Sequence, residues 1–274
     1  MSVITFNSGD DEWRVRLDQP LDIAIGLDFD GPQPNHFDAP RASAEPLKVG
    51  DFVGDTRLGG SCNARRLHLT PHCNGTHTEC IGHVTDDHPG IGDVAPPAFM
   101  LAGLVTITPE PAVQSSDTTS PASGPKDKLI TQATLAHGLT NIGDPDIEAI
   151  VVRTLPNDRA KQFKKYGKTG RPPYFSLDAI AHLVALGVRH LLSDTPSVDR
   201  DHDEGRLAGH RLFWGLPATS RHVDDASRPE ATVTEMVFVP DEIIDGVYLL
   251  NLQVPPFLSD AAPSRPVLYR PEPS

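Results

Sequence analysis

The run from His72 to Val84 holds the densest group of potential metal ligands in this chain. It reads His-Cys-Asn-Gly-Thr-His-Thr-Glu-Cys-Ile-Gly-His-Val. Five of the twelve histidines fall between His68 and His88, a concentration that scattered surface placement would rarely produce. Whatever fold the chain adopts must therefore bring these side chains together, and we expect this run to form the active site.

The spacing of His77 and Glu79 indicates how the run can bind an ion. Side chains two positions apart on an extended segment point to the same face. His77 and Glu79 can therefore reach one ion from a single strand or loop. Gly75, just before them, lets the backbone turn or approach another segment closely. The pattern predicts a metal centre with both nitrogen and oxygen ligands.

Two other interpretations of the run are open. The histidines can be solvated loop residues with no common role. Alternatively, a structural zinc knot can draw nitrogen and sulfur ligands from Cys73, His77, Cys80 and His83. The absence of a Cys-x-x-Cys pair argues against the knot, and the run is typical of an ordered loop inside a large domain.

The run resembles the signature of the cyclase-like metal-dependent hydrolases, the family that contains bacterial kynurenine formamidase and isatin hydrolase. That signature reads H-x-G-T-H-x-D-x-P-x-H. The positions that match it are Gly75, Thr76, His77 and His83, while Glu79 replaces the Asp and Ile81 replaces the Pro.

Cys73 occupies the position of the family's first metal-binding histidine, and His72 stands one residue earlier. As a thiolate, a cysteine is a competent ligand and favours zinc over manganese. His72 can serve instead only if the loop is rearranged relative to the family.

Later segments extend the resemblance to roughly Arg66–Arg270. The loop 194–199 resembles a second family signature, although an Asx/Pro turn has the same composition. His210 follows on an expected helix, 203–214. Glu235 lies between apolar neighbours in an expected strand, 232–240, and a buried carboxylate needs a partner or an ion because burying an unpaired charge costs several kcal/mol. If the strand instead turns Glu235 to water, it is an ordinary solvated residue.

The resemblance implies an α+β protein with the swivelling β/β/α fold, whose mixed sheet or barrel core has flanking helices. It implies one or two divalent metals, zinc first and manganese second. The implied metal ligands are Cys73, His77, Glu79, His210 and Glu235. His83 is the implied catalytic proton carrier, with an unperturbed pKa near about 6.5.

The implied reaction is attack by metal-activated water on a small-molecule formamide, amide, lactam or lactone, as in an arylformamidase. The alternative is a member of the same fold that binds metal but has altered or lost catalysis. Dehydration or cyclisation on the same fold is a third possibility.

The whole chain limits the possible partners. A formal charge of -13 and a pI near 5.3 disfavour nucleic acid and anionic membranes, which leaves small-molecule substrates. Three cysteines make no disulfide framework and fit a reducing, cytoplasmic compartment. We see no signal peptide and no apolar run long enough to span a membrane. We expect a homodimer or homotetramer.

We expect one domain, 1–274, with a flexible insertion at 109–128, which is rich in Pro, Ser, Thr and Asp. Apolar runs predict buried strands at 100–108 and 147–154. Ser176 precedes the clearest helical pattern, 176–187. Further elements are expected as strands within 13–27, 66–70 and 188–193, and as a helix at 131–139, whereas 28–46 is expected to be irregular.

Overall fold

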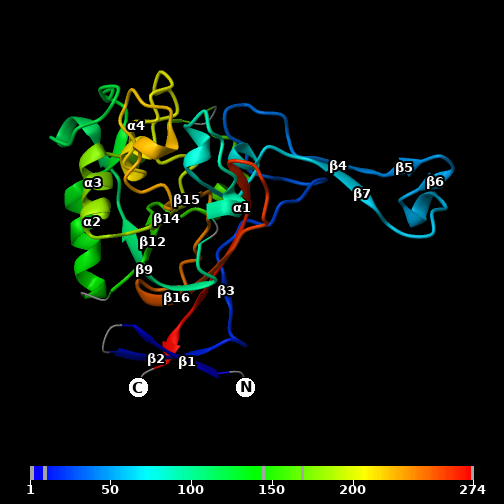
Figure 1. Cartoon of the computed structure of the whole chain (residues 1–274), viewed down its shortest axis with the longest axis horizontal. Coiled ribbons are helices and arrows are strands. Elements are labelled where there is room, and N and C mark those ends of the chain that lie inside the picture. The colour runs from blue at the N-terminus through cyan, green and yellow to red at the C-terminus, as the bar shows by residue number, and fades with distance from the viewer. Residues whose placement is uncertain (1–2, 9–10, 95, 144–145, 168–169, 273–274) are drawn as a thin grey trace.

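A mixed sheet of nine strands organises the chain (Figure 1). The computed structural model describes residues 3–8, 11–94, 96–143, 146–167 and 170–272. In spatial order the strands are β17 (Ala261–Pro263), β8 (His77–Glu79), β15 (Thr232–Glu235), β14 (His190–Ser193), β12 (Ala149–Thr154), β9 (Phe99–Ile107), β16 (Gly246–Gln253), β18 (Arg265–Tyr269) and β3 (Leu21–Asp22).

The centre of the sheet is parallel and buried on both faces. Strands β9, β12, β14 and β15 run parallel, and the other pairings in this sheet are antiparallel. Every residue of β12 and β14 is buried. Strands covered on both faces need continuous apolar runs, which is why the two runs at 100–108 and 147–154 predicted them correctly.

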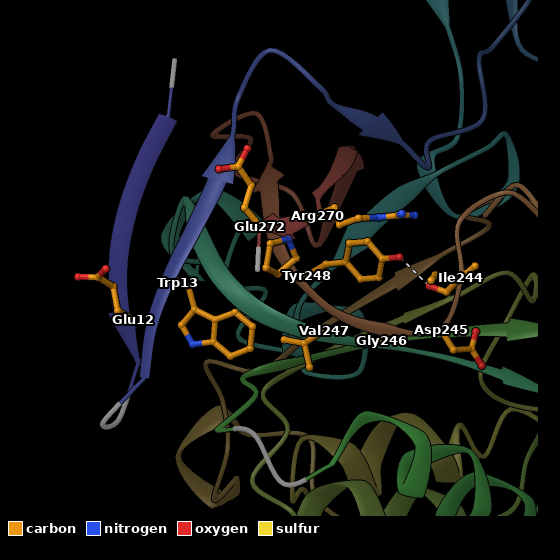
Figure 2. A pocket seen from close by; sticks show the side chains of 10 residues that line it. Glu12, Trp13, Ile244, Asp245, Gly246, Val247, Tyr248, Arg270 and Glu272 are labelled. Atoms are coloured by element: carbon orange, nitrogen blue, oxygen red, sulfur yellow. Dashed lines mark hydrogen bonds between the residues drawn. The ribbon is translucent and has the colours of Figure 1, made fainter. Parts of the chain in front are cut away.

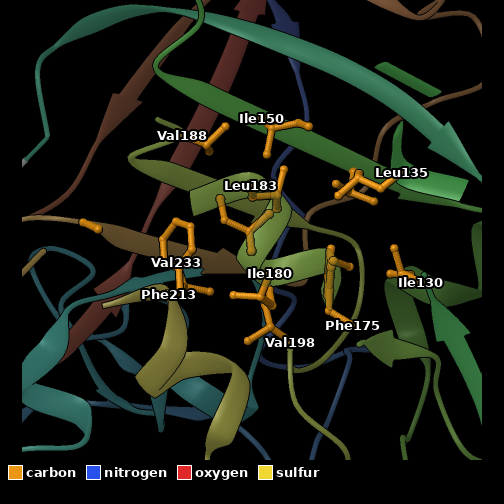
Figure 3. Close-up of a cluster of buried hydrophobic side chains, with 14 of the residues drawn as sticks. Ile130, Leu135, Ile150, Phe175, Ile180, Leu183, Val188, Val198, Phe213 and Val233 are labelled. Atoms are coloured by element: carbon orange, nitrogen blue, oxygen red, sulfur yellow. The ribbon is translucent and has the colours of Figure 1, made fainter. Parts of the chain in front are cut away.

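Helices α2 (Gln132–Leu139), α3 (Leu177–Ala185) and α4 (Ala208–Phe213) lie on one side of the sheet. Figure 3 shows the core between them, where Ile150 of β12 and Leu183 of α3 belong to one buried cluster. The Ser176 hydroxyl caps α3 by accepting a hydrogen bond of 3.0 Å from the amide of Ala179. The predicted cap and helix are both confirmed.

The sheet is curled, and its other face encloses a second core. A second buried cluster joins Ile23, near the β3 edge, to Val237, just after β15. Phe238 donates a backbone hydrogen bond of 2.8 Å to the Ile23 carbonyl, and Ala24 bridges Val237. These contacts join the β3 edge to a segment near the other edge. The expected α+β architecture with a curled mixed sheet is confirmed.

A two-stranded arm projects from this body (Figure 1). It pairs β4 (Ser43–Pro46) with β7 (Arg65–His68), and its tip pairs β5 (Lys48–Val49) with β6 (Phe52–Val53). All four residues of β7 are exposed. The strand predicted at 66–70 therefore begins one residue earlier and has no buried face, and β4 lies within the segment that was expected to be irregular.

The remaining strands form two small sheets. β1 (Val3–Ser8), β2 (Asp11–Arg16) and β19 (Pro271–Glu272) bring the two ends of the chain together. β10 (Glu110–Pro111), β11 (Lys128–Ile130) and β13 (Tyr174–Phe175) form the other.

The segment 109–128, expected as an insertion, is tied to the helices. The Asp117 carboxylate accepts hydrogen bonds of 2.7 Å from the Gln132 amide and the Ser176 hydroxyl. The Thr118 carbonyl accepts one of 2.9 Å from the Leu177 amide. The segment thus connects the beginnings of α2 and α3.

Candidate metal centre

Strand β8 places two of the predicted site residues between β15 and β17. His77 lies opposite Glu235, and Glu79 lies opposite both Val233 and Ala261. Residues directly opposite one another in an antiparallel pair share a face. His77, Glu79 and Glu235 therefore converge, and all three side chains are buried.

Gly75 and Thr76 fix the backbone that leads into β8. Gly75 has φ of 133°, a conformation that side chains rarely tolerate. The Thr76 hydroxyl accepts a hydrogen bond of 2.8 Å from the Ile25 amide and donates one of 2.5 Å to the Met236 carbonyl. The Gly75 carbonyl lies 2.9 Å from His77 Nδ1. A carbonyl only accepts, so Nδ1 donates and Nε2 remains free for the centre.

His210 enters from α4 and is oriented by Asp199. The Asp199 carboxylate lies 2.7 Å from His210 Nδ1 and also accepts from the amides of Gly209 and His210. This arrangement directs Nε2 of His210 toward Glu79 Oε1, 2.6 Å away. The loop 194–199 thus supplies the carboxylate that holds a predicted ligand, although α4 is shorter than the expected helix 203–214.

His72, and not Cys73, joins the centre. It lies in the short 3₁₀ turn Pro71–Cys73, and its Nδ1 is 2.9 Å from Glu79 Oε2. Cys73 belongs to none of the groups of three or more potential ligands found among the described residues. Its thiol is buried, and burial together with the charge of Glu235 raises its pKa. The geometry thus places His72, the alternative to Cys73, beside Glu79.

His83 faces the same centre from the 3₁₀ turn Ile81–His83, with Nε2 3.9 Å from Glu79 Oε2. About a quarter of its side chain is exposed. Gly82 before it packs against Pro89, whose carbonyl oxygen would lie 2.2 Å from any added Cβ. Gly82 is thus needed for close packing.

Asp260 is a site residue that the sequence did not reveal. Its Oδ2 lies 2.8 Å from His72 Nε2 and 3.2 Å from His83 Nδ1. It is separated from His72 by 188 residues and follows no pattern of its own. The resemblance extends past this position, to roughly Arg270, but implied no role for Asp260.

Several buried atoms of this centre lack hydrogen-bond partners. They are His77 Nε2, His210 Nε2 and both carboxylate oxygens of Glu79. Ion-pair distances nonetheless join some of them, 2.6 Å from His210 Nε2 to Glu79 Oε1 and 3.6 Å from His77 Nε2 to Glu235 Oε2. Buried polar atoms are rarely left unpaired, because each costs about 1–3 kcal/mol.

The spacing of these atoms fits a divalent metal. Ligand atoms about 2.1 Å from a tetrahedral zinc lie about 3.4 Å from one another. Glu235 matches this value, with its oxygens 3.6 Å from His77 Nε2 and 3.5 Å from His210 Nε2. The distances from Glu79 to His210 and His72, 2.6 and 2.9 Å, are shorter than this value.

Two groups of potential ligands share Glu79. One contains His72, His77 and Glu79, and the other contains Glu79, His210 and Glu235. Oε2 of Glu79 faces the first group and Oε1 faces the second. A third group, of His72, His83 and Asp260, adjoins them.

The charges of the centre keep the carboxylate ionised. Burial raises the pKa of Glu79, but the positive charges of His83 and His210 outweigh burial and hold that pKa well below its usual value. Burial lowers the pKa of His210, and the charge of Glu79 more than reverses this. His210 thus holds a proton that a bound cation would displace.

A small pocket of about 150 Å³ lies beside the centre. His36, Tyr166 and Asp201 are among its lining residues. The His36 amide donates a hydrogen bond of 3.0 Å to the Cys73 carbonyl, which ties this pocket to the ligand loop. Both ring nitrogens of His36 are buried without hydrogen-bond partners, although Nε2 lies 3.8 Å from Asp201 Oδ1, and burial lowers the pKa of His36 to about 4.

A larger pocket of about 520 Å³ lies elsewhere, between the terminal sheet and β16. Figure 2 shows Trp13, Val247 and Tyr248 along it. None of the clustered histidines or carboxylates lines it, so its size does not make it the chemical site.

The mixed sheet and the buried histidine–carboxylate groups define an α+β protein with a candidate metal centre. A profile of the family described as putative cyclase matches residues 15–200. The chain therefore belongs to this cyclase family, and the resemblance drawn from the motif is confirmed. No curated protein matches the chain.

Solved structures share its fold at low sequence identity. A predicted metal-dependent hydrolase from Bacillus stearothermophilus is 16% identical, with a TM-score of 0.56 over 92% of this chain and 98% of that chain. Isatin hydrolase A from Labrenzia aggregata is 15% identical, with a TM-score of 0.60 over 93% and 94%. The enzyme of the same name from Ralstonia solanacearum is 16% identical, with a TM-score of 0.59 over 92% and 91%.

No helix in the part of the chain that the structure describes is long and apolar enough to cross a membrane.

Proposed function

We propose that this protein is a metal-dependent hydrolase that cleaves a small-molecule formamide, amide, lactam or lactone. The observation that best supports this proposal is that ligand atoms of His77, Glu79 and His210 are buried without hydrogen-bond partners. The groups that contain these residues place their ligand atoms close enough to share one ion. Membership of the cyclase family and the shared fold of the isatin hydrolases support the same conclusion.

Two divalent cations would fit the two ligand groups, and Glu79 belongs to both groups. His72 and His77 would hold one cation, and His210 and Glu235 the other. Zinc suits the nitrogen and oxygen donors, and manganese is the second candidate. When bound, such a cation polarises a carbonyl and lowers the pKa of water toward about 7.

His83 is the proposed proton carrier. Its Nε2 faces the shared carboxylate of Glu79 at 3.9 Å, and its partial exposure leaves a route for protons to solvent. A group that only moves a proton contributes a factor of about 10² to 10⁴ in rate. The leaving nitrogen or oxygen of the substrate would take its proton from this ring.

The pocket beside the centre is suited to a compact substrate ring. His36 packs on Phe37 with 3.8 Å between ring centroids and meets Tyr166 edge-on at 6.2 Å. The unpaired nitrogens of His36 offer one donor and one acceptor to such a ring, because its lowered pKa keeps it neutral. Isatin is a cyclic amide, so the isatin hydrolase neighbours favour a lactam as the first substrate to test.

The test compares metal-free and zinc- or manganese-loaded protein on isatin, N-formylkynurenine and simple lactones. We expect hydrolysis only with metal, and we expect it to fall below a hundredth of the parental rate in His77→Ala. His68→Ala is the matched control, because His68 is exposed on the arm and its ring contacts Glu45, away from the centre. Metal binding without any turnover would instead support a non-catalytic member of the fold.

A further inference from the structure

Asp260 lies where the end of the chain meets the ligand loop. It immediately precedes β17, which pairs with β8 so that Ala261 lies opposite Glu79. The Cys80 amide donates a hydrogen bond of 2.9 Å to the Asp260 carbonyl. This backbone pairing fixes the position of Asp260 relative to the residues on both sides of Cys80.

One carboxylate oxygen of Asp260 contacts two histidines. Oδ2 lies 2.8 Å from His72 Nε2 and 3.2 Å from His83 Nδ1. The two rings stack with 4.2 Å between centroids and 28° between planes. The other oxygen, Oδ1, accepts a hydrogen bond of 3.2 Å from the Ser259 hydroxyl. The carboxylate is thus held on its outer side and faces the stacked rings with its inner oxygen.

These contacts decide which nitrogen each ring offers to the centre. An ionised carboxylate only accepts hydrogen bonds, so the nitrogens that face Asp260 carry the protons. His72 is left with Nδ1 toward Glu79 Oε2, at 2.9 Å. His83 is left with Nε2 toward the same oxygen, at 3.9 Å. A carboxylate behind a ligating histidine fixes its ring nitrogen and orientation in this way.

His72 has particular need of such support. It stands one residue before the motif position that Cys73 occupies, and so reaches the centre from a different point on the backbone. About a fifth of its side chain is exposed, whereas His77 is fully buried. Packing alone therefore constrains His72 less than it constrains His77.

We propose that Asp260 is a positioning residue that holds His72 as a metal ligand through Nδ1 and aims Nε2 of His83 at the reacting centre. The proposal rests on the proposed function for its metal and its reaction. It assigns to Asp260 no contact with substrate.

The test measures metal binding without substrate. Asp260→Ala and Asp260→Asn are reloaded with zinc, and stoichiometry and affinity are determined by elemental analysis and chelator competition. We expect the parent to bind two ions and each variant to bind one of them about 10 to 100 times more weakly. His72→Asn should weaken the same ion, and adding Asp260→Ala to it should cause no further loss. Ser259→Ala, which removes only the outer contact, is the matched control.

Activity provides the second measurement. Even at saturating zinc, kcat of Asp260→Asn should be at least 10-fold below that of the parent, because His83 loses its orientation. KM should change less than 3-fold. Parental affinity for both ions in Asp260→Ala would overturn the proposal, and so would additive losses in the double variant. If the parent binds two ions but hydrolyses nothing, the proposed function fails while the metal-binding result still decides the role of Asp260.

Discussion

Replacing Glu79 by glutamine is the sharpest single test of the centre. The change keeps the size of the side chain but removes its charge and turns one acceptor oxygen into a donor. Oε1 faces His210 at 2.6 Å, and Oε2 faces His72 at 2.9 Å, so one substitution alters both ligand groups. His72→Asn, in contrast, leaves the group of Glu79, His210 and Glu235 intact.

The size of the effect follows from the position of Glu79. Loss of a residue that merely supports a ligand weakens metal binding by about 10- to 100-fold. Glu79 is a direct candidate ligand and is fully buried, so we expect at least about 100-fold for each ion, or at least about 2.7 kcal/mol. At a free zinc concentration that fills both sites of the parent, Glu79→Gln should bind fewer than half an ion per chain.

The assay is elemental analysis of desalted protein, supported by competition with a chromophoric chelator. The parent should hold two ions, His72→Asn one, and Glu79→Gln almost none, while circular dichroism confirms that each remains folded. Two retained ions in Glu79→Gln would remove this residue from the metal centre. Loss of only one ion would show that Glu79 does not lie between two cations.

Three further changes test the surroundings of the centre. His83→Ala should keep both ions and its Tm while kcat falls about 10²- to 10⁴-fold, and a variant isolated without metal would make His83 a ligand. Lys161→Met should lower the free energy of unfolding by about 3 kcal/mol, because Lys161 Nζ lies 2.7 Å from the fully buried Asp194 carboxylate. Urea unfolding at pH 8 measures this, and an unchanged midpoint would contradict it. Burial lowers the pKa of His190 from 6.5 to about 4. Between these two pH values, the unfolded chain therefore binds a proton at His190 that the folded chain does not. The parent should therefore lose up to about 3 kcal/mol between pH 6.5 and 4 that His190→Gln does not lose, and parallel stability curves would refute this.

The sequence by itself determined the elements whose signals are local. The apolar run at 147–154 became β12, buried on both faces, because a strand in that position admits only apolar or satisfied side chains. Ser176 capped α3 as its hydroxyl chemistry requires. His77 and Glu79 share a face of β8 because alternation along a strand depends on nothing beyond the strand.

Only the tertiary structure decided which distant residues complete the centre. Asp260 reaches His72 because β17 pairs with β8, a choice of strand order that no local pattern encodes. His72 replaced Cys73 because the turn at 71–73 directs its ring, and not the thiol, toward Glu79. The exposed β7 has the same alternation as a buried strand, but it pairs with β4 in an arm away from the sheet. Periodicity predicts which side chains share a face. The pairing of segments far apart in the chain determines which residues that face contacts.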